Sequence, residues 1–390
     1  MNITMIGCPF KTSYGIYADL LRSAIENKTG SKIQWLASNC GCGDPVEKSK
    51  IFQIQGCDYF EQPHILNFAY TPERKLWKHW LRTRASHLSY ALRSRKYSKL
   101  SGDAELVHFQ QILNAYGFSA VYHWLNLPSK AARVVTVHEL DPYQREFPSK
   151  CAVYNKADAI HVHCEELKQE LVKRYVQPEK IHVVLEGTAV PAVLEEAPRN
   201  GIVFYGGHHL MSGKGIPTLF QAMAILKQRL GVDAPVVTMH GHYSDDSPAQ
   251  AQPLAEQLGV SDKIEWLSHP GTEELGKLYR SSSVCVLPYS GSFAGFPAAL
   301  AAANGLPVIA TRKAGIPDHL GDCGIWIDEN NAEQLAQRVM GLLASEALWQ
   351  EQSARLRQRA KDFLSIDVIA ERTLEVYEQA LKNKAKPSRQ

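Results

Sequence analysis

Short apolar segments separated by helix-length stretches are the feature of this 390-residue chain that most constrains its fold. In the first half they lie at residues 3–6, 106–109, 133–137, 159–162 and 181–184. The second half starts the pattern again, at 201–205, 236–239, 264–267, 284–287, 307–310 and 325–327. Widely spaced strands with helical patterns between them are typical of parallel sheets, because a parallel connection must cross the sheet. The sequence therefore predicts an α/β protein with two doubly wound parallel sheets.

The repeated pattern also predicts the domain organisation, since the chain is too long for one ordinary core. Residues 186–200 lose the periodicity and contain two prolines, which is typical of a connection between domains. We expect a first Rossmann-like domain at residues 1–187, a linker at 188–200 and a second such domain at 201–365. A last helical pattern within 366–390 is expected to pack back on the first domain.

Composition restricts the class of protein. The formal net charge is only +3, which demands neither a nucleic acid nor a membrane as partner. No stretch approaches the roughly 20 apolar residues of a membrane-spanning helix, and the first residues lack a signal-peptide pattern. The Cys40–Cys42 spacing does not fit a zinc ribbon, so we expect reduced thiols and no metal site. These features predict a cytoplasmic protein.

The glycine-rich loop at residues 205–215 is the most informative candidate site. It follows a predicted strand and opens a predicted helix, so its glycines let backbone N–H groups approach an anion. Lys214 adds a compact positive charge. The loop is not a P-loop, because Gly215 stands where Ser or Thr would be needed. A solvated lysine at a helix start is the alternative to diphosphate binding.

A second loop, at residues 288–297, again joins a strand to an apolar helix. Pro297 suits the first helical position, and the amides before it can then form a phosphate-binding nest. A plain turn is the alternative. Two glycine-rich helix starts in one domain favour a diphosphate ligand.

The chain resembles a GT-B glycosyltransferase of the large retaining family 4. The resemblance is carried by an ordered series of segments in the second half: 214–216, 236–241, 264–279, 284–297, 305–310 and 314–318. In the first half, residues 15–16, 103–108, 135–140 and 179–187 are similar to the family's segments. The series covers nearly the full length. It implies two Rossmann-like domains that face a cleft.

This resemblance also implies an activity. Family members move a sugar from a nucleotide diphosphate sugar to a hydroxyl acceptor with retention, without a required metal or other cofactor. Positive charge stabilises the leaving diphosphate. The donor site carried over consists of Gly15, Gly207, His208, His209, Lys214, Ser292, Phe293, Ala294 and Gly295. We expect a role in surface polysaccharide or glycolipid assembly, with a glycan or a lipid-linked acceptor.

The chain departs from the family at two expected glutamates. One alignment places them at Ser292 and Leu300, another at Ala294 and Ala302, so neither contains a carboxylate. The family's arginine is also missing, with His208 or His209 nearby. An active transferase with other groups on the ribose is one interpretation. A catalytically silent scaffold that binds a partner protein or a glycan is the other, and a sugar-nucleotide epimerase has no carboxylate constellation to support it.

Histidines at predicted strand ends are further candidates. His108 matches a family histidine, and His138 follows the next strand, so both are candidate catalytic groups beside Lys214. Each could equally be structural. His161 and His163 alternate on one strand and are interpreted as structural.

The segment at residues 74–99 has nine Lys or Arg and no acidic residue, interleaved with tryptophan and leucine. A solvated helical face is one interpretation. The other is a docking surface for an anionic membrane or a lipid-diphosphate acceptor, which would place the protein at the inner face of the membrane. Aromatic residues among basic ones also fit single-stranded nucleic acid, but nothing else in the chain supports that partner.

Overall fold

The computed structural model describes residues 1–7, 13–38, 58–60, 102–110, 130–140, 148–194, 197–207, 213–241, 247–268, 270–291 and 295–385. The chain divides into two compact units. The first unit consists of Met1–His163, Leu167–Val184 and Ala370–Gln390, and the second of Cys164–Glu166 and Leu185–Ile369. The predicted domain limits at 187 and 200 stay predictions.

The first unit contains a parallel sheet of seven strands in the order β3-β2-β1-β4-β5-β6-β7. The strands are β1 (Ile3–Gly7), β2 (Gln34–Ser38), β3 (Asp58–Phe60), β4 (Leu106–Gln110), β5 (Ala132–Val137), β6 (Ala159–Val162) and β7 (Ile181–Val183). Every residue of β4 and β6 is buried, which is typical of parallel strands covered on both faces. The predicted parallel sheet is confirmed.

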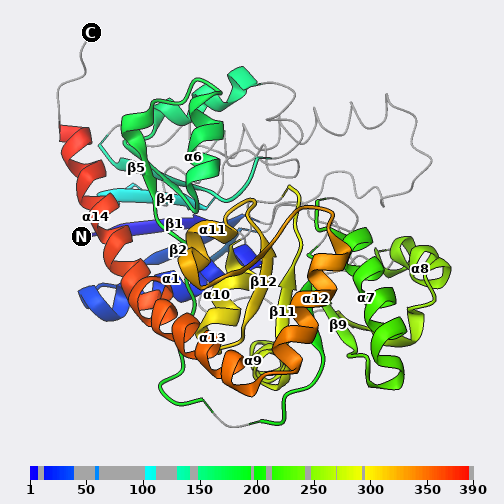
Figure 1. The fold of residues 1–390 in the computed structure, drawn as a ribbon. Helices are drawn as coiled ribbons and strands as arrows, with labels where there is room; N and C mark the ends of the chain where they lie inside the picture. The colour runs from blue at the N-terminus through cyan, green and yellow to red at the C-terminus, as the bar shows by residue number, and fades with distance from the viewer. Residues whose placement is uncertain are drawn as a thin grey trace. The chain divides into compact units, whose positions relative to one another are not determined.

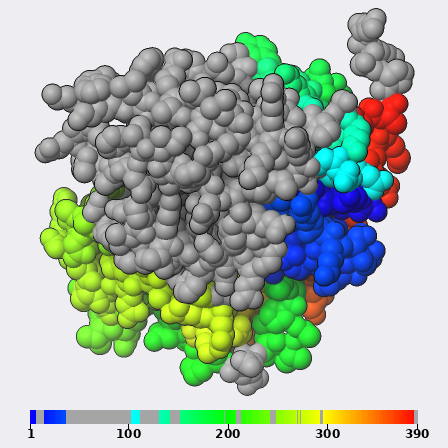
Figure 2. Space-filling model, turned by 180° about the vertical axis from the view of Figure 1, so that it is seen from behind, coloured from blue at the N-terminus to red at the C-terminus, as the bar shows by residue number. Residues whose placement is uncertain are grey.

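Helices α1 (Ser13–Thr29) and α6 (Glu165–Val172) and the 3₁₀ segments at Pro148–Lys156 and Pro178–Lys180 connect these strands. The last helix, α14 (Ile366–Ala385), joins the first unit from Ala370 onward. Its Glu371 accepts a 2.6 Å hydrogen bond from the Lys28 ammonium group, and its Asn383 amide donates to the Asp158 carbonyl at 2.9 Å. Figures 1 and 2 show the end of α14 in red beside the blue and cyan residues of this unit.

The second unit contains a parallel sheet of six strands in the order β10-β9-β8-β11-β12-β13. The strands are β8 (Ile202–Tyr205), β9 (Val237–Gly241), β10 (Ile264–Ser268), β11 (Val284–Leu287), β12 (Val308–Thr311) and β13 (Ile325–Ile327). All residues of β11 and β12 are buried, so this sheet is also covered on both faces. The predicted second doubly wound sheet is confirmed.

The helices of this unit are α7 (Ile216–Leu230), α8 (Ser247–Gln257), α9 (Thr272–Ser281), α10 (Phe296–Ala303), α11 (Ile316–Leu320), α12 (Ala332–Leu343) and α13 (Glu346–Arg359). Short 3₁₀ turns lie at Gly231–Asp233, Ser261–Lys263 and Gly321–Cys323, and a π-helical turn at Ala360–Leu364 follows α13. α7 packs against α12, whereas α10 packs against α11 and α13 (Figure 1). Because α10 and α12 both contact β12, the two helix groups cover the sheet.

Strands β2 and β3 were not among the predicted strands. β2 begins with Gln34 and ends with Ser38, and β3 has three residues and begins with Asp58. Segments so short and so mixed in polarity carry little strand signal of their own. Their pairing with neighbouring strands at the β1 side of the sheet determines them instead.

The start of α7 is fixed by a glycine. Gly215 precedes the helix with a φ of 73°, in the left-handed region that disfavours side chains. A Cβ atom at this position would lie 1.9 Å from the carbonyl oxygen of Pro288, directly after β11. The backbone before α7 and the backbone after β11 therefore touch, and no side chain fits between them.

We expect Gly215→Ala to destabilise the protein by about 3 kcal/mol, from left-handed strain plus steric overlap. Gly259→Ala is the matched control, because Gly259 has a φ of 65° but nothing within 4 Å of a Cβ atom. The control should cost about 1 kcal/mol. Chemical unfolding of both variants measures the difference, and equal losses would show that the contact with Pro288 is unimportant.

Candidate functional site

The second sheet has a topological switch point between β8 and β11. From this pair the chain continues to β9 and β10 on one side and to β12 and β13 on the other. Open α/β sheets bind ligands at the carboxyl ends of the strands at such a point, because the following loops diverge there. The two loops predicted to bind diphosphate, at residues 205–215 and 288–297, begin where these two strands end.

Three helices of the second unit begin with the same kind of triplet. Glycine is the N-cap residue, an apolar residue comes first in the helix and proline second, in α7 (215–217), α10 (295–297) and α11 (315–317). The N-cap glycines themselves provide no side-chain cap for these three helix starts. Because helix starts carry unsatisfied N–H groups and partial positive charge, an acceptor from elsewhere can bind there.

Lys214 lies immediately before the α7 triplet and is buried, with 8% of its surface exposed. Its ammonium nitrogen lies 4.3 Å from the ring centroid of Tyr289 and 5.5 Å from that of Tyr205. The Tyr289 hydroxyl donates a hydrogen bond to the Tyr205 carbonyl at 2.7 Å, which fixes the ring. Aromatic faces attract cations, so the two tyrosines hold the ammonium group in a largely desolvated place.

Glu186 is a buried carboxyl group in this unit that was not among the predicted site residues. Its Oε2 accepts hydrogen bonds from the N–H groups of Gly295 at 2.9 Å and Phe296 at 2.8 Å, at the start of α10. Burial raises the pKa of Glu186, while His319, the two amides and Lys214 oppose that rise. A carboxyl group thus occupies amides of the predicted phosphate nest.

The other predicted donor-site residues are only partly described. Gly207 follows β8 with a φ of 66°, and Gly295 is the N-cap of α10. Gly15 lies near the start of α1 in the first unit and is buried. The remaining predicted residues, His208, His209, Ser292, Phe293 and Ala294, lie outside the described residues. The binding roles of all these residues stay predictions.

The first unit has a chain of hydrogen bonds through buried histidines. His161 Nε2 donates to the Val184 carbonyl at 2.8 Å, so Nδ1 accepts, from the Thr136 hydroxyl at 3.2 Å. Thr136 in turn accepts from His108 Nε2 at 2.7 Å, and His108 Nδ1 accepts from the Tyr377 hydroxyl at 2.7 Å. His108 therefore lies within β4 with both ring nitrogens bonded. It does not end the strand as predicted, because β4 continues to Gln110.

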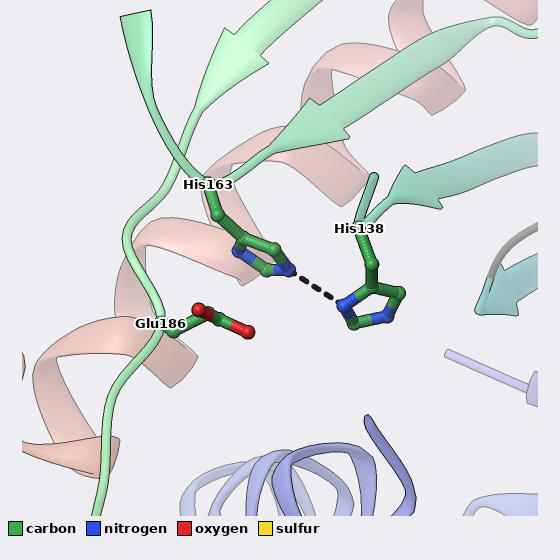
Figure 3. Close-up of side chains that lie close together, drawn as sticks. All are labelled: His138, His163 and Glu186. Atoms are coloured by element: carbon green, nitrogen blue, oxygen red, sulfur yellow. Dashed lines mark hydrogen bonds between the residues drawn. The ribbon is translucent and has the colours of Figure 1, made fainter. Parts of the chain in front are cut away.

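A second branch contains the other candidate histidine. His138, after β5, and His163, after β6, share a 3.1 Å hydrogen bond (Figure 3). His163 Nδ1 donates to the Val184 carbonyl at 3.1 Å, so His163 Nε2 accepts from His138 Nδ1. Gln110 Oε1 is placed 2.9 Å from His138 Nε2. If His138 is neutral and carries its hydrogen on Nδ1, its Nε2 must accept, so the side-chain amide of Gln110 must be turned to bring its nitrogen to Nε2 as the donor. His161 and His163 are both buried in this network, and their interpretation as structural stays a prediction.

Burial and the neighbouring histidines lower the pKa of His108 and of His138 well below the ordinary value. Burial and His163 do the same for His161, against a smaller opposing effect of its bond to Val184. His108, His138 and His161 are therefore neutral near pH 7. The proposed catalytic roles of His108 and His138 stay predictions, and such roles would use neutral imidazoles.

Acid should destabilise this network. A histidine whose pKa is lower in the folded than in the unfolded protein binds its proton first in the unfolded state, where the pKa is about 6.5. The unfolding free energy is therefore highest above about pH 6.5 and falls as the pH drops from there toward the folded pKa. Each such histidine adds a slope of about 1.4 kcal/mol per pH unit. Between about pH 6.5 and pH 5, the unfolding free energy of His161→Gln should therefore fall less steeply than that of the wild type, by about 1.4 kcal/mol per pH unit.

His182 provides the control, because it is only partly buried and burial lowers its pKa less. His182→Gln should change the slope less than His161→Gln does. Urea unfolding at a series of pH values measures both. Identical slopes for the wild type and His161→Gln would mean that His161 is not held neutral by the fold.

Most of the second unit matches a known protein family. Residues 192–363 match the family described as glycosyl transferases group 1. An MMP alpha-(1->4)-mannosyltransferase from Mycolicibacterium hassiacum is 28% identical over 211 residues, which cover 53% of this chain and 50% of that protein. The chain spans about half the length of the curated relatives it matches.

Solved structures share the fold over almost the whole chain. A sucrose-phosphate synthase from Thermosynechococcus elongatus has a TM-score of 0.72 and 18% identity, covering 98% of this chain and 99% of that one. Anabaena Alr3699/HepE, solved in complex with UDP and glucose, has a TM-score of 0.70 and 13% identity, covering 97% and 99%. Residues 192–363 therefore match the group 1 glycosyl transferase family, and the chain as a whole shares its fold with GT-B structural neighbours.

Proposed function

We propose that the protein moves a sugar from a nucleotide diphosphate sugar to a hydroxyl acceptor, with retention of configuration. The observation that carries this proposal is the buried ammonium group of Lys214 before α7, at the switch point between β8 and β11. A desolvated cation beside an uncapped helix start is a strong anion site. A diphosphate is the anion that fits both partners.

In the proposed reaction, the bond between the sugar's anomeric carbon and the diphosphate breaks. The acceptor oxygen forms a new bond on the same face of that carbon, and its proton passes to the leaving diphosphate. Lys214 and the first turn of α7 stabilise the negative charge that develops on the diphosphate. We propose that these groups suffice without a metal ion or another cofactor.

Two similar proteins support the choice of donor class. The Anabaena structure contains UDP and glucose, and the Mycolicibacterium relative is named a mannosyltransferase. Both are consistent with an activated hexose as the donor. The base and the sugar used by this chain are to be identified by binding experiments.

We further propose a glycan or lipid-linked acceptor, in surface polysaccharide or glycolipid assembly. The basic segment at residues 74–99, the candidate membrane contact, lies outside the described residues. Among the helices that the structure does describe, none has the length and apolar character needed to cross a bilayer. We propose that contact with the membrane surface is made through the basic and aromatic side chains of residues 74–99.

A silent scaffold is the second candidate. It is favoured by one observation: α10 has Leu300 and Ala302 where carboxylates were expected, and Glu186 already occupies its first amides. In that case the second unit would be a binding module without nucleotide affinity.

Titration calorimetry with UDP, GDP, ADP and their common sugars distinguishes the two candidates. We expect one nucleotide to bind, and Lys214→Ala to weaken it by at least about tenfold through loss of the phosphate's charge partner. Lys227→Ala is the control, because Lys227 lies on the same α7 helix but forms an exposed ion pair with Asp262. It should change the affinity by less than about twofold. Failure of every nucleotide to bind at millimolar concentration would favour the silent scaffold.

A further inference from the structure

Glu186 is more rigidly held than a helix cap requires. Its carboxyl group comes from a segment more than a hundred residues before α10, and only 4% of the residue is exposed. One oxygen, Oε2, accepts both N–H groups of the α10 start. Within the described part of the second unit, the other oxygen, Oε1, makes no hydrogen bond. A serine or aspartate in the loop would cap the helix without burying a distant carboxyl group.

The backbone of Glu186 is fixed as well. Its N–H group donates to His319 Nε2 at 3.1 Å, and His319 Nδ1 donates to the Gly315 carbonyl at 2.6 Å. These two bonds require the neutral tautomer with hydrogen on Nδ1. Burial lowers the pKa of His319, which agrees with this neutral form. Gly295 packs on the imidazole so closely that a Cβ atom would lie 1.9 Å from it.

The residues after Glu186 are also paired. The backbone N–H group of Thr188 donates to the Leu364 carbonyl, and the Thr188 carbonyl accepts from the Ile366 N–H group, both at 3.0 Å. Gly187 approaches Leu364 so closely that a Cβ atom would lie 2.7 Å from the carbonyl oxygen. Glu186 therefore has a fixed side chain on a fixed backbone, as a preorganised binding group needs.

The two charged groups at this end of the sheet are suited to different parts of a donor molecule. A carboxylate repels a diphosphate, so Glu186 is unsuited to that part of a donor, whereas Lys214 is suited to it. Hydroxyl groups are hydrogen-bond donors that a fixed carboxyl oxygen recognises well. In a nucleotide diphosphate sugar, the transferred sugar is attached directly to the phosphate whose charge grows during the reaction. It is therefore the hydroxyl-rich group nearest to a lysine that stabilises that phosphate.

We propose that Glu186 binds hydroxyl groups of the transferred sugar and thereby contributes to donor specificity. This inference rests on the proposed glycosyl transfer. It assigns Lys214 to the diphosphate and Glu186 to the sugar. The start of α10 is then a support that orients a carboxyl group and is not itself the phosphate site.

Glu186→Gln tests the assignment, because the amide keeps the size of the side chain and loses the charge. Calorimetry compares UDP with UDP-glucose, or GDP with GDP-mannose if the wild type binds guanine nucleotides. We expect the variant to bind the nucleotide within about twofold of the wild type and the nucleotide sugar about tenfold more weakly. Lys214→Ala should weaken both ligands.

Ser345→Ala is the matched control, since it removes the cap of α13 in the same unit. It should lower the melting temperature without changing either affinity. If Glu186→Gln does not fold, Glu186→Asp takes its place, and the same sugar-specific loss is expected because the carboxyl group is drawn back.

Equal losses for the nucleotide and its sugar, or no loss for either, would overturn the assignment of Glu186 and show that it is only a helix cap. Those outcomes leave the proposed function intact as long as Lys214→Ala weakens nucleotide binding. If the wild type binds no nucleotide and no nucleotide sugar, the proposed function fails, and the role of Glu186 fails with it.

Discussion

The buried ammonium group of Lys214 is the interaction on which the account of the second unit depends. A charge with 8% of its residue exposed is costly unless nearby groups compensate for lost water. Here the faces of Tyr289 and Tyr205 and the electrostatic influence of Glu186 supply that compensation. The contact between Gly215 and Pro288 then fixes the start of α7 next to the lysine, which is the arrangement that the proposed diphosphate site requires.

Six of the seven strands of the first sheet follow the same order as the six strands of the second sheet, but the two units differ in their polar groups. In the first unit, histidines within and directly after the strands are joined by hydrogen bonds, and Tyr377 of α14 is part of the same chain of bonds. The second unit places charge there, with a lysine, a carboxyl group and three glycine-capped helix starts. In the proposed function, the charge in the second unit is what suits it to an ionic donor.

Much of this architecture could be predicted from the sequence, because strand and helix periodicity repeats in both halves. Lys214 could be found because it stands in a glycine-rich turn between a strand and a helix. Glu186 could not, since its partners at Gly295 and Phe296 are distant in sequence and the segment after it had lost its periodicity. The recurring glycine–apolar–proline triplet is a sequence signal that could have linked the three helix starts. His108 was placed at a strand end, but its bonds to Thr136 and Tyr377 depend on tertiary packing.

A crystal structure of the protein with a bound nucleotide diphosphate sugar tests the central claim most directly. We expect phosphate oxygens to contact the Lys214 ammonium group and a hydroxyl of the transferred sugar to contact the Glu186 carboxyl group. A donor bound elsewhere on the second unit, with Lys214 still against Tyr289 and no phosphate beside it, would contradict the account.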